Sequence, residues 1–138
     1  MKRITNTSRR STLKSPDVVS RQYKLPFAPN QTIKVQFWDQ AASSNLFPKI
    51  VLQQTKGVVL VVDVNDKASF DKIAEWSKRI EQEFSPNTQK ILVANKVDNE
   101  GSQRAFGPLE GHKVASNLGF IGYYEVSALE NINIDKPI

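Results

Sequence analysis

The chain has 138 residues, of which 39% are hydrophobic and 24% are charged, and this composition is ordinary for one soluble globular domain. It contains no cysteine, which excludes disulfides, thiolate metal sites and the attachment of prenyl or palmitoyl groups to this sequence. The formal net charge of +5 leaves an anionic membrane or a nucleic acid open as partners.

The first sixteen residues carry basic side chains and no acidic one. No aromatic residue lies among them, so they do not form a base-stacking surface, and we expect no nucleic-acid partner. No apolar segment follows that could serve as a secretory signal, so a cytoplasmic location is expected. We interpret residues 1–16 as a disordered basic arm.

An antiparallel hairpin is the first predicted element. Residues 18–25 and 32–38 alternate between polar and apolar side chains, which is typical of strands with one covered face. The stretch 26–30 between them is rich in turn-forming residues.

Two continuous apolar runs, residues 57–62 and 90–94, are typical of strands that are buried on both faces of a parallel sheet. Apolar side chains recur at helical spacing between the two runs. We predict a helix there, capped at Asn65 or Asp66 and ended by residues 85–87.

A second helix is predicted over residues 109–118, with Gly119 in the left-handed conformation that ends many helices. A further strand is predicted over residues 123–126. Strands that alternate with helices favour right-handed crossovers in a parallel α/β sheet.

Three polar clusters directly follow predicted strands. They are Trp38-Asp39-Gln40-Ala41-Ala42, Asn95-Lys96-Val97-Asp98 and Ser127-Ala128-Leu129. Ligands of such sheets bind outside the carboxyl ends of the strands, so three clusters in this order indicate a binding site.

These clusters resemble the motifs of Ras-like small GTPases, and most of all the Rab family. Residues 95–98 match the NKxD guanine motif in full, and residues 127–129 resemble its SAK motif with Leu129 in place of lysine. Residues 38–43 resemble WDTAGQ with several departures. Segments 119–120 and 131–134 are most similar to the Rab subgroup of lysosome-related organelles.

The resemblance implies a partial Ras-like P-loop NTPase fold over residues 1–138, as a single G domain. Its mostly parallel sheet would have helices on both faces. The phosphate loop G-x-x-x-x-G-K-[ST] does not occur in the sequence, so we expect the first strand, that loop and the last helix to be missing. Without the first strand, residues 32–38 and 57–62 would each keep an unpaired edge.

The chemistry of residues 95–98 follows from their side chains. The carboxylate of Asp98 could accept hydrogen bonds from the N1–H and the exocyclic amine of guanine. Adenine has no such donor pair, and an unpaired carboxylate would discriminate against it. The aliphatic stem of Lys96 could cover one face of the base, and Asn95 is expected to tie this loop to its neighbours.

The resemblance completes the guanine side with Ser127, Ala128 and Leu129, where the Ala128 N–H would meet guanine O6. The alternative is that Asn95 to Asp98 form a solvated turn after a strand, since asparagine and aspartate favour such turns.

The magnesium and phosphate side is also inferred from the resemblance. Asp39 aligns with the magnesium-side aspartate, although it could simply cap a strand end. Ala42 stands where the family has the glycine that meets the γ-phosphate, and Ser43 stands where a glutamine orients water. Ser15, or less well Thr12, aligns with the switch threonine, and no catalytic residue is assigned.

The implied ligands are GTP or GDP, with Mg²⁺, and the implied partners are effector and regulator proteins of the Rab type. The resemblance further implies a role in vesicle traffic, peripheral to endomembranes in a full-length form. GTP hydrolysis is left open, because the phosphate loop and the glutamine are lacking. The alternatives are a non-catalytic pseudo-GTPase that acts as an interaction module, or the product of a truncated gene model.

Overall fold

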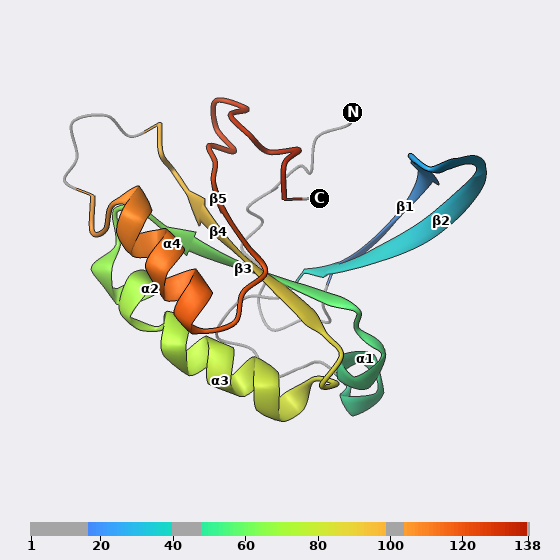
Figure 1. Ribbon diagram of the computed structural model, residues 1–138, viewed down its shortest axis with the longest axis horizontal. Coiled ribbons are helices and arrows are strands. Elements are labelled where there is room, and N and C mark those ends of the chain that lie inside the picture. Colours follow the sequence, from blue (N-terminus) through green and yellow to red (C-terminus); the bar gives the residue numbers. More distant parts are fainter. Residues whose placement is uncertain (1–16, 40–47, 99–103, 138) are drawn as a thin grey trace. The chain divides into compact units, whose positions relative to one another are not determined.

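The computed structural model describes residues 17–39, 48–98 and 104–137 (Figure 1). They belong to two compact units, a β-hairpin within Ser8–Pro48 and an α/β unit within Lys49–Ile138. The predicted basic arm, residues 1–16, lies outside the described residues. The single G domain over residues 1–138 stays a prediction.

The hairpin pairs β1 (Asp17–Leu25) with β2 (Ala28–Asp39) in antiparallel register. Only residues 26 and 27 form the turn, so β2 begins inside the stretch that we expected to be a loop. A register shift at Lys24 and Leu25 accommodates the extra residues of β2. The predicted hairpin is therefore confirmed, with a tighter turn.

Apolar side chains of the hairpin share one face. Val19 lies opposite Phe37, and Tyr23 lies opposite Ile33. The rings of Tyr23 and Phe37 meet edge to face with their centroids 6.4 Å apart, a favourable arrangement for aromatic pairs. The alternation of polar and apolar side chains that was predicted for residues 32–38 is thus present in β2.

The α/β unit is built on a parallel sheet of β3 (Gly57–Asp63), β4 (Gln89–Asn95) and β5 (Gly122–Glu125). The strands lie in the order β3-β4-β5. Both continuous apolar runs are strands and they pair in parallel, which confirms the predicted α/β class.

The segment between β3 and β4 forms two helices where one was predicted. Asp66 caps α2 (Lys67–Asp71), since its carboxylate accepts a hydrogen bond of 3.0 Å from the Ala68 N–H. The backbone N–H of Lys72 bonds to the carbonyls of Ala68 and Phe70, which closes α2. The longer helix α3 (Ile73–Glu83) begins at the next residue.

The second predicted helix is α4 (Pro108–Asn117), and Gly119 has the expected positive φ of 75° just beyond it. Gly111 faces β5 so closely that a Cβ atom would lie 2.2 Å from the ring of Tyr123. Only glycine allows this approach of α4 to the sheet. A short helix, α1 (Lys49–Gln54), precedes β3.

The core lies on one face of the sheet, and Figure 1 shows α2, α3 and α4 on that side. It consists of Val62, Val64, Ile73, Leu92, Ala94, Phe106, Ala115, Phe120 and Tyr123. On the opposite face, Val59 and Val61 remain 45% and 56% exposed. No helix in the described ranges covers that second face, although we expected helices on both.

The edges of the two sheets agree with the sequence expectation. Across the residues that the structure describes, β3 pairs with β4 alone and β2 pairs with β1 alone. Both strands therefore keep an edge without a partner strand. None of the helices in the described ranges has the length and apolar character that crossing a bilayer requires.

Candidate functional site

Polar residues gather where the three parallel strands end. Asn95 lies beside Asp63 in the register of β3 and β4. The Val97 N–H donates to the carbonyl of Val126 over 3.3 Å, and so joins the segment after β4 to the segment after β5. Residues 95–98 and 127–128, from two of the three predicted polar clusters, therefore meet at one edge of the sheet.

Asn95 links the two segments through its side chain. Its Oδ1 accepts a hydrogen bond of 3.1 Å from the backbone N–H of Ala128. The predicted tie between Asn95 and a neighbouring loop is therefore confirmed. The same bond engages the N–H that we expected to face guanine O6.

Asp98 is held by Ser127. The hydroxyl of Ser127 donates to Asp98 Oδ1 over 2.5 Å and accepts from the Glu130 N–H over 3.0 Å. Ser127 is fully buried, and its backbone exchanges two hydrogen bonds with that of Ile132. A buried, fully bonded serine therefore fixes the position of the carboxylate.

Lys96 is paired with Asp63. Its backbone has a φ of 69°, in the left-handed region that non-glycine residues rarely adopt, and its ammonium lies 2.6 Å from Asp63 Oδ2. The hydrogen bond with Asp63 is the main cause that raises the pKa of Lys96. Partial burial raises the pKa of Asp63, but the bonds from Lys96 and Asn65 outweigh it and hold that pKa below its ordinary value.

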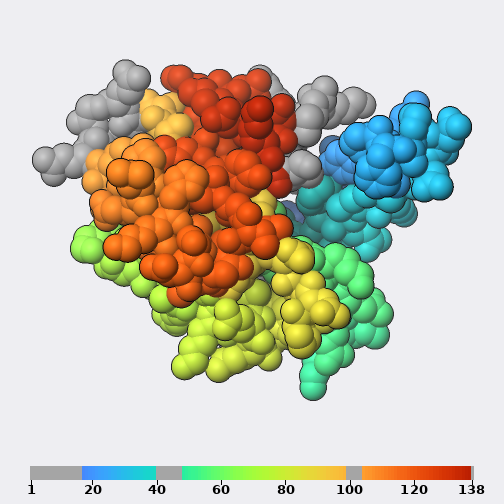
Figure 2. Space-filling view, viewed as in Figure 1, coloured from blue at the N-terminus to red at the C-terminus, as the bar shows by residue number. Residues whose placement is uncertain are grey.

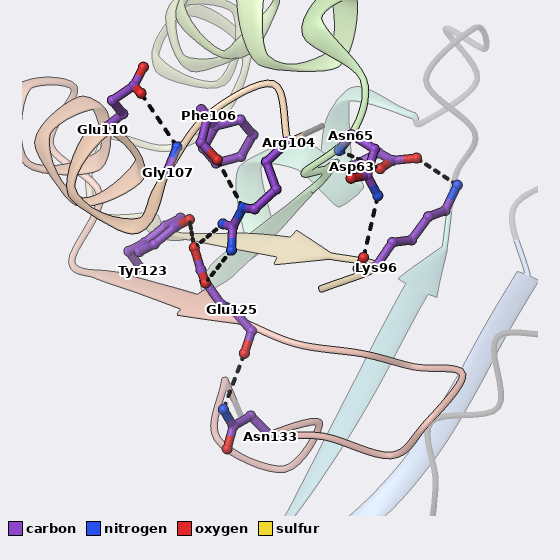
Figure 3. A network of polar contacts seen from close by, with 10 residues as sticks. All are labelled: Asp63, Asn65, Lys96, Arg104, Phe106, Gly107, Glu110, Tyr123, Glu125 and Asn133. Carbon is purple, nitrogen blue, oxygen red and sulfur yellow. Dashed lines mark hydrogen bonds and ion pairs between the residues drawn. The ribbon is translucent and has the colours of Figure 1, made fainter. Parts of the chain in front are cut away.

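A second ionic group lies beside β5 (Figure 3). The guanidinium of Arg104 holds both carboxylate oxygens of Glu125, at 3.2 and 2.5 Å, and the Tyr123 hydroxyl donates to the same carboxylate over 2.8 Å. Burial tends to raise the pKa of Glu125, yet the bonds from Arg104 and Tyr123 hold it below its ordinary value. Asn133 donates to the Glu125 carbonyl over 3.2 Å and so fastens the segment after β5.

A cleft of about 220 Å³ lies at the ends of β3 and β4. Its lining consists of Val61, Val62, Asp63, Ser69, Asn95 and Lys96. In Figure 2 the surface of α4 adjoins that of the residues after β5. Asn95, one of the lining residues, also bonds to the loop of Ala128, so the cleft adjoins that loop.

Of the remaining predicted site residues, two lie among the described residues, one in each compact unit. Leu129 is 84% exposed, and Asp39 ends β2 in the hairpin unit, where it is also exposed. Ala42 and Ser15 lie outside the described residues. Within the described ranges, no three histidine, aspartate or glutamate side chains gather as a metal ion would need.

Sequence reasoning assigned no site role to Asp63, Arg104 or Glu125, and it considered Asn65 only as a helix cap. The signal for Asp63 was present, because it follows a predicted strand directly, as Asn95 does. Arg104 and Glu125 are 21 residues apart in the sequence and form no local pattern, so only the fold could pair them.

Comparison with known proteins identifies the family of the chain. The model of the Ras family matches residues 5–138. The chain belongs to the Ras family. This Ras-family chain is 39% identical over 106 residues to the Ras-related protein RABE1d of Arabidopsis thaliana, an alignment that covers 75% of the chain and 49% of that relative.

RABE1d and a second Rab-named relative show that this family member is of the Rab type. The Ras-related protein Rab-12 of Mus musculus is 30% identical over 138 residues, covering 99% of the chain and 56% of that relative. The GTP-binding protein ypt2 of Schizosaccharomyces pombe is 37% identical, covering 75% and 52%. The chain spans about half the length of the curated relatives it matches. Its assignment to the subgroup of lysosome-related organelles stays a prediction.

Proposed function

We propose that this Rab-type chain recognises the guanine base of GTP or GDP at the carboxyl ends of β4 and β5. The observation that carries the proposal is the Asp98 carboxylate, which Ser127 holds at 2.5 Å beside the loop of Ala128. A positioned carboxylate is the group that distinguishes guanine, because the N1–H and the exocyclic amine form a donor pair that adenine lacks.

The other residues of the site have separate roles in this proposal. Asn95 joins the loops of Asp98 and Ala128, so the carboxylate and the backbone donor move as one piece. The Ala128 N–H would be shared between Asn95 Oδ1 and guanine O6, as a bifurcated hydrogen bond. Lys96 would lay its aliphatic stem along one face of the base, and Leu129 would add apolar surface at the rim.

The base preference of the chain tests this proposal. Asp98→Asn replaces an acceptor by an amide that can donate to the C2 oxygen of xanthine. We expect the variant to shift preference from guanosine to xanthosine by roughly tenfold or more, measured by competitive titration, since hydrogen bonds to charged groups contribute about 1.5–3 kcal/mol. Asp71→Asn, on the exposed surface of α2, is the matched control. An unchanged ratio of guanosine to xanthosine affinity would contradict the assignment.

The residues predicted for the Mg²⁺ side do not form a metal site in the described ranges, where no three histidine, aspartate or glutamate side chains gather. Asp39 offers one exposed carboxylate, and Ala42 has no ligating side chain. Mg²⁺ prefers six oxygen ligands in octahedral geometry, which this set does not supply. We therefore derive the recognition of the base alone, and no step of hydrolysis is assigned to these residues.

We infer the cellular role from family membership. A Rab-type protein would act in membrane traffic through effector and regulator proteins, peripheral to endomembranes. Co-purification of effectors with this chain, dependent on guanine nucleotide, is the measurement that supports the role. Effector capture that ignores nucleotide would contradict it.

One observation favours a second candidate, a pseudo-GTPase that acts as an interaction module. Ser127 and Asn95 already engage Asp98 and the Ala128 N–H. A site whose polar groups satisfy one another gains less from a nucleotide. Titration of the chain with GDP and guanosine separates the two candidates, because the module would bind neither.

A further inference from the structure

The last residue of β3 and a residue just after it hold Lys96 at two points (Figure 3). The Lys96 ammonium lies 2.6 Å from Asp63 Oδ2, and Asn65 Nδ2 donates to the Lys96 carbonyl over 3.4 Å. Both contacts come from one short segment, residues 63–65. They support a backbone that sits in the unfavourable left-handed region.

Asp63 is also held in place by groups other than Lys96. Its Oδ1 accepts the Asn65 N–H over 2.9 Å, and its own N–H donates to the hydroxyl of Ser69 over 3.1 Å. Each carboxylate oxygen therefore has one partner, and the side chain is only 25% exposed. Lys96, by contrast, is 60% exposed, so without Asp63 its ammonium would be free to sample water.

The partners of the NKxD segment divide into two sets. Asn95 and Asp98 bond to residues 127 and 128, whereas Lys96 bonds to Asp63. An exposed ion pair contributes little to stability, because water screens it and two side chains must be ordered. The pair does, however, set the course of the lysine stem along the cleft that Asp63, Asn95 and Lys96 help to line.

We propose that Asp63 is a positioning residue of the guanine site, which holds the Lys96 ammonium so that the lysine stem is ordered as a wall for the base. The inference rests on the proposed function, in which that stem covers one face of guanine. Its advantage is preorganisation: a side chain ordered during folding loses no further rotamer freedom when the ligand binds. The raised pKa of Lys96 is in keeping with this arrangement.

Guanosine titration of the full chain tests the proposal. Asp63→Asn should weaken guanosine binding about three- to tenfold, the range expected when one long side chain must be ordered on binding. Asp66→Asn removes the same charge from the same loop and keeps a residue that caps α2, so its affinity should stay within about twofold.

A double variant separates positioning from a structural role. Lys96→Met keeps an apolar stem but has no ammonium for Asp63 to hold. Adding Asp63→Asn to Lys96→Met should therefore leave guanosine affinity unchanged within about twofold. If Asp63→Asn weakens binding equally with and without the ammonium, Asp63 acts through the loop and the proposal is overturned.

Chemical labelling checks the ion pair without any nucleotide. Acetic anhydride reacts with the neutral amine, so Lys96 should react faster in Asp63→Asn than in the unchanged chain, as followed by peptide mass spectrometry. Equal rates would overturn the pairing. Guanosine binding that is intact in the unchanged chain and in Asp63→Asn would overturn this inference alone, whereas an unchanged chain that binds no guanosine would overturn the proposed function and this inference with it.

Discussion

The two ends of β4 each carry a lysine, and the two lysines differ in almost every respect. Lys90, near the start of the strand, is 6% exposed, and its ammonium donates to the Ser77 hydroxyl over 2.6 Å and to Glu81 over 2.9 Å. It also lies 4.9 Å from the centroid of the Phe120 ring. Lys96, just past the end of the strand, is 60% exposed and has a strained backbone.

The difference separates a structural end of the sheet from the end where we propose that the base binds. At the Lys90 end, a polar group is buried and surrounded by partners from α3 and the turn before β5, so its contacts hold helices to the sheet. At the Lys96 end, polar groups line a cleft and a residue is kept in an unfavourable conformation. Backbone strain and open polar clusters are typical of ligand sites, whereas satisfied buried groups are typical of the scaffold.

The largest effect is expected at the structural end. Lys90→Ala removes a buried stem and one partner of Ser77, so the free energy of unfolding should fall by about 2–4 kcal/mol. Lys90→Met keeps the stem volume and should lower it by less than about 1.5 kcal/mol. Urea denaturation measures both variants. If a Lys90 variant kept its stability but lost guanosine affinity, the contrast between the two ends of β4 would be wrong.

A smaller effect is expected from the ionic group beside β5. Glu125→Gln weakens the bonds from Arg104 and Tyr123, and it should lower the free energy of unfolding by about 1–2 kcal/mol, because charged hydrogen bonds are lost at a partly buried site. Thermal unfolding of the variant beside the unchanged chain measures the loss. An unaltered melting temperature would show that solvent screens the group fully.

The same carboxylate predicts a dependence on pH. The folded pKa of Glu125 lies below its ordinary value of 4.5, so its contribution to stability is fully present above that pH. The contribution is lost as the pH falls through the folded pKa, since the folded state then gains the proton. The difference in stability between the unchanged chain and Glu125→Gln should therefore shrink between about pH 7 and about pH 3. A difference that stays constant would count against the ion pair.

The smallest effect is expected on the open surface of α2. Lys67 and Asp71 lie 3.0 Å apart with side chains 75% and 56% exposed. Asp71→Asn should change the free energy of unfolding by no more than about 0.5 kcal/mol, because exposed i,i+4 pairs are screened by water. The same denaturation experiment measures it. A larger loss of stability would mean that the exposure of an ion pair does not predict its contribution to the free energy of unfolding in this fold.

Much of the fold was readable from local patterns. The apolar runs 57–62 and 90–94 are parallel strands, and Gly119 ends α4 with the positive φ that its residue type permits. The break between α2 and α3 was not readable, because Lys72 is an ordinary helix residue and the break depends on how its N–H is shared. The sequence likewise did not show which face of the sheet is covered, because this depends on where the helices pack.

The sequence by itself determined the family and predicted the chemistry of the site. Within the NKxD segment, and within the SAK-like segment, the residues lie only a few positions apart and form a recognisable motif. The two segments follow parallel strands, and the ends of such strands meet at one edge of the sheet. Only the tertiary structure decided which groups hold them. Ser127 meets Asp98 across 29 residues, and Lys96 meets Asp63 across two strands in register. Side-chain partners that are distant in sequence leave no period or motif, because their pairing depends on how the chain packs.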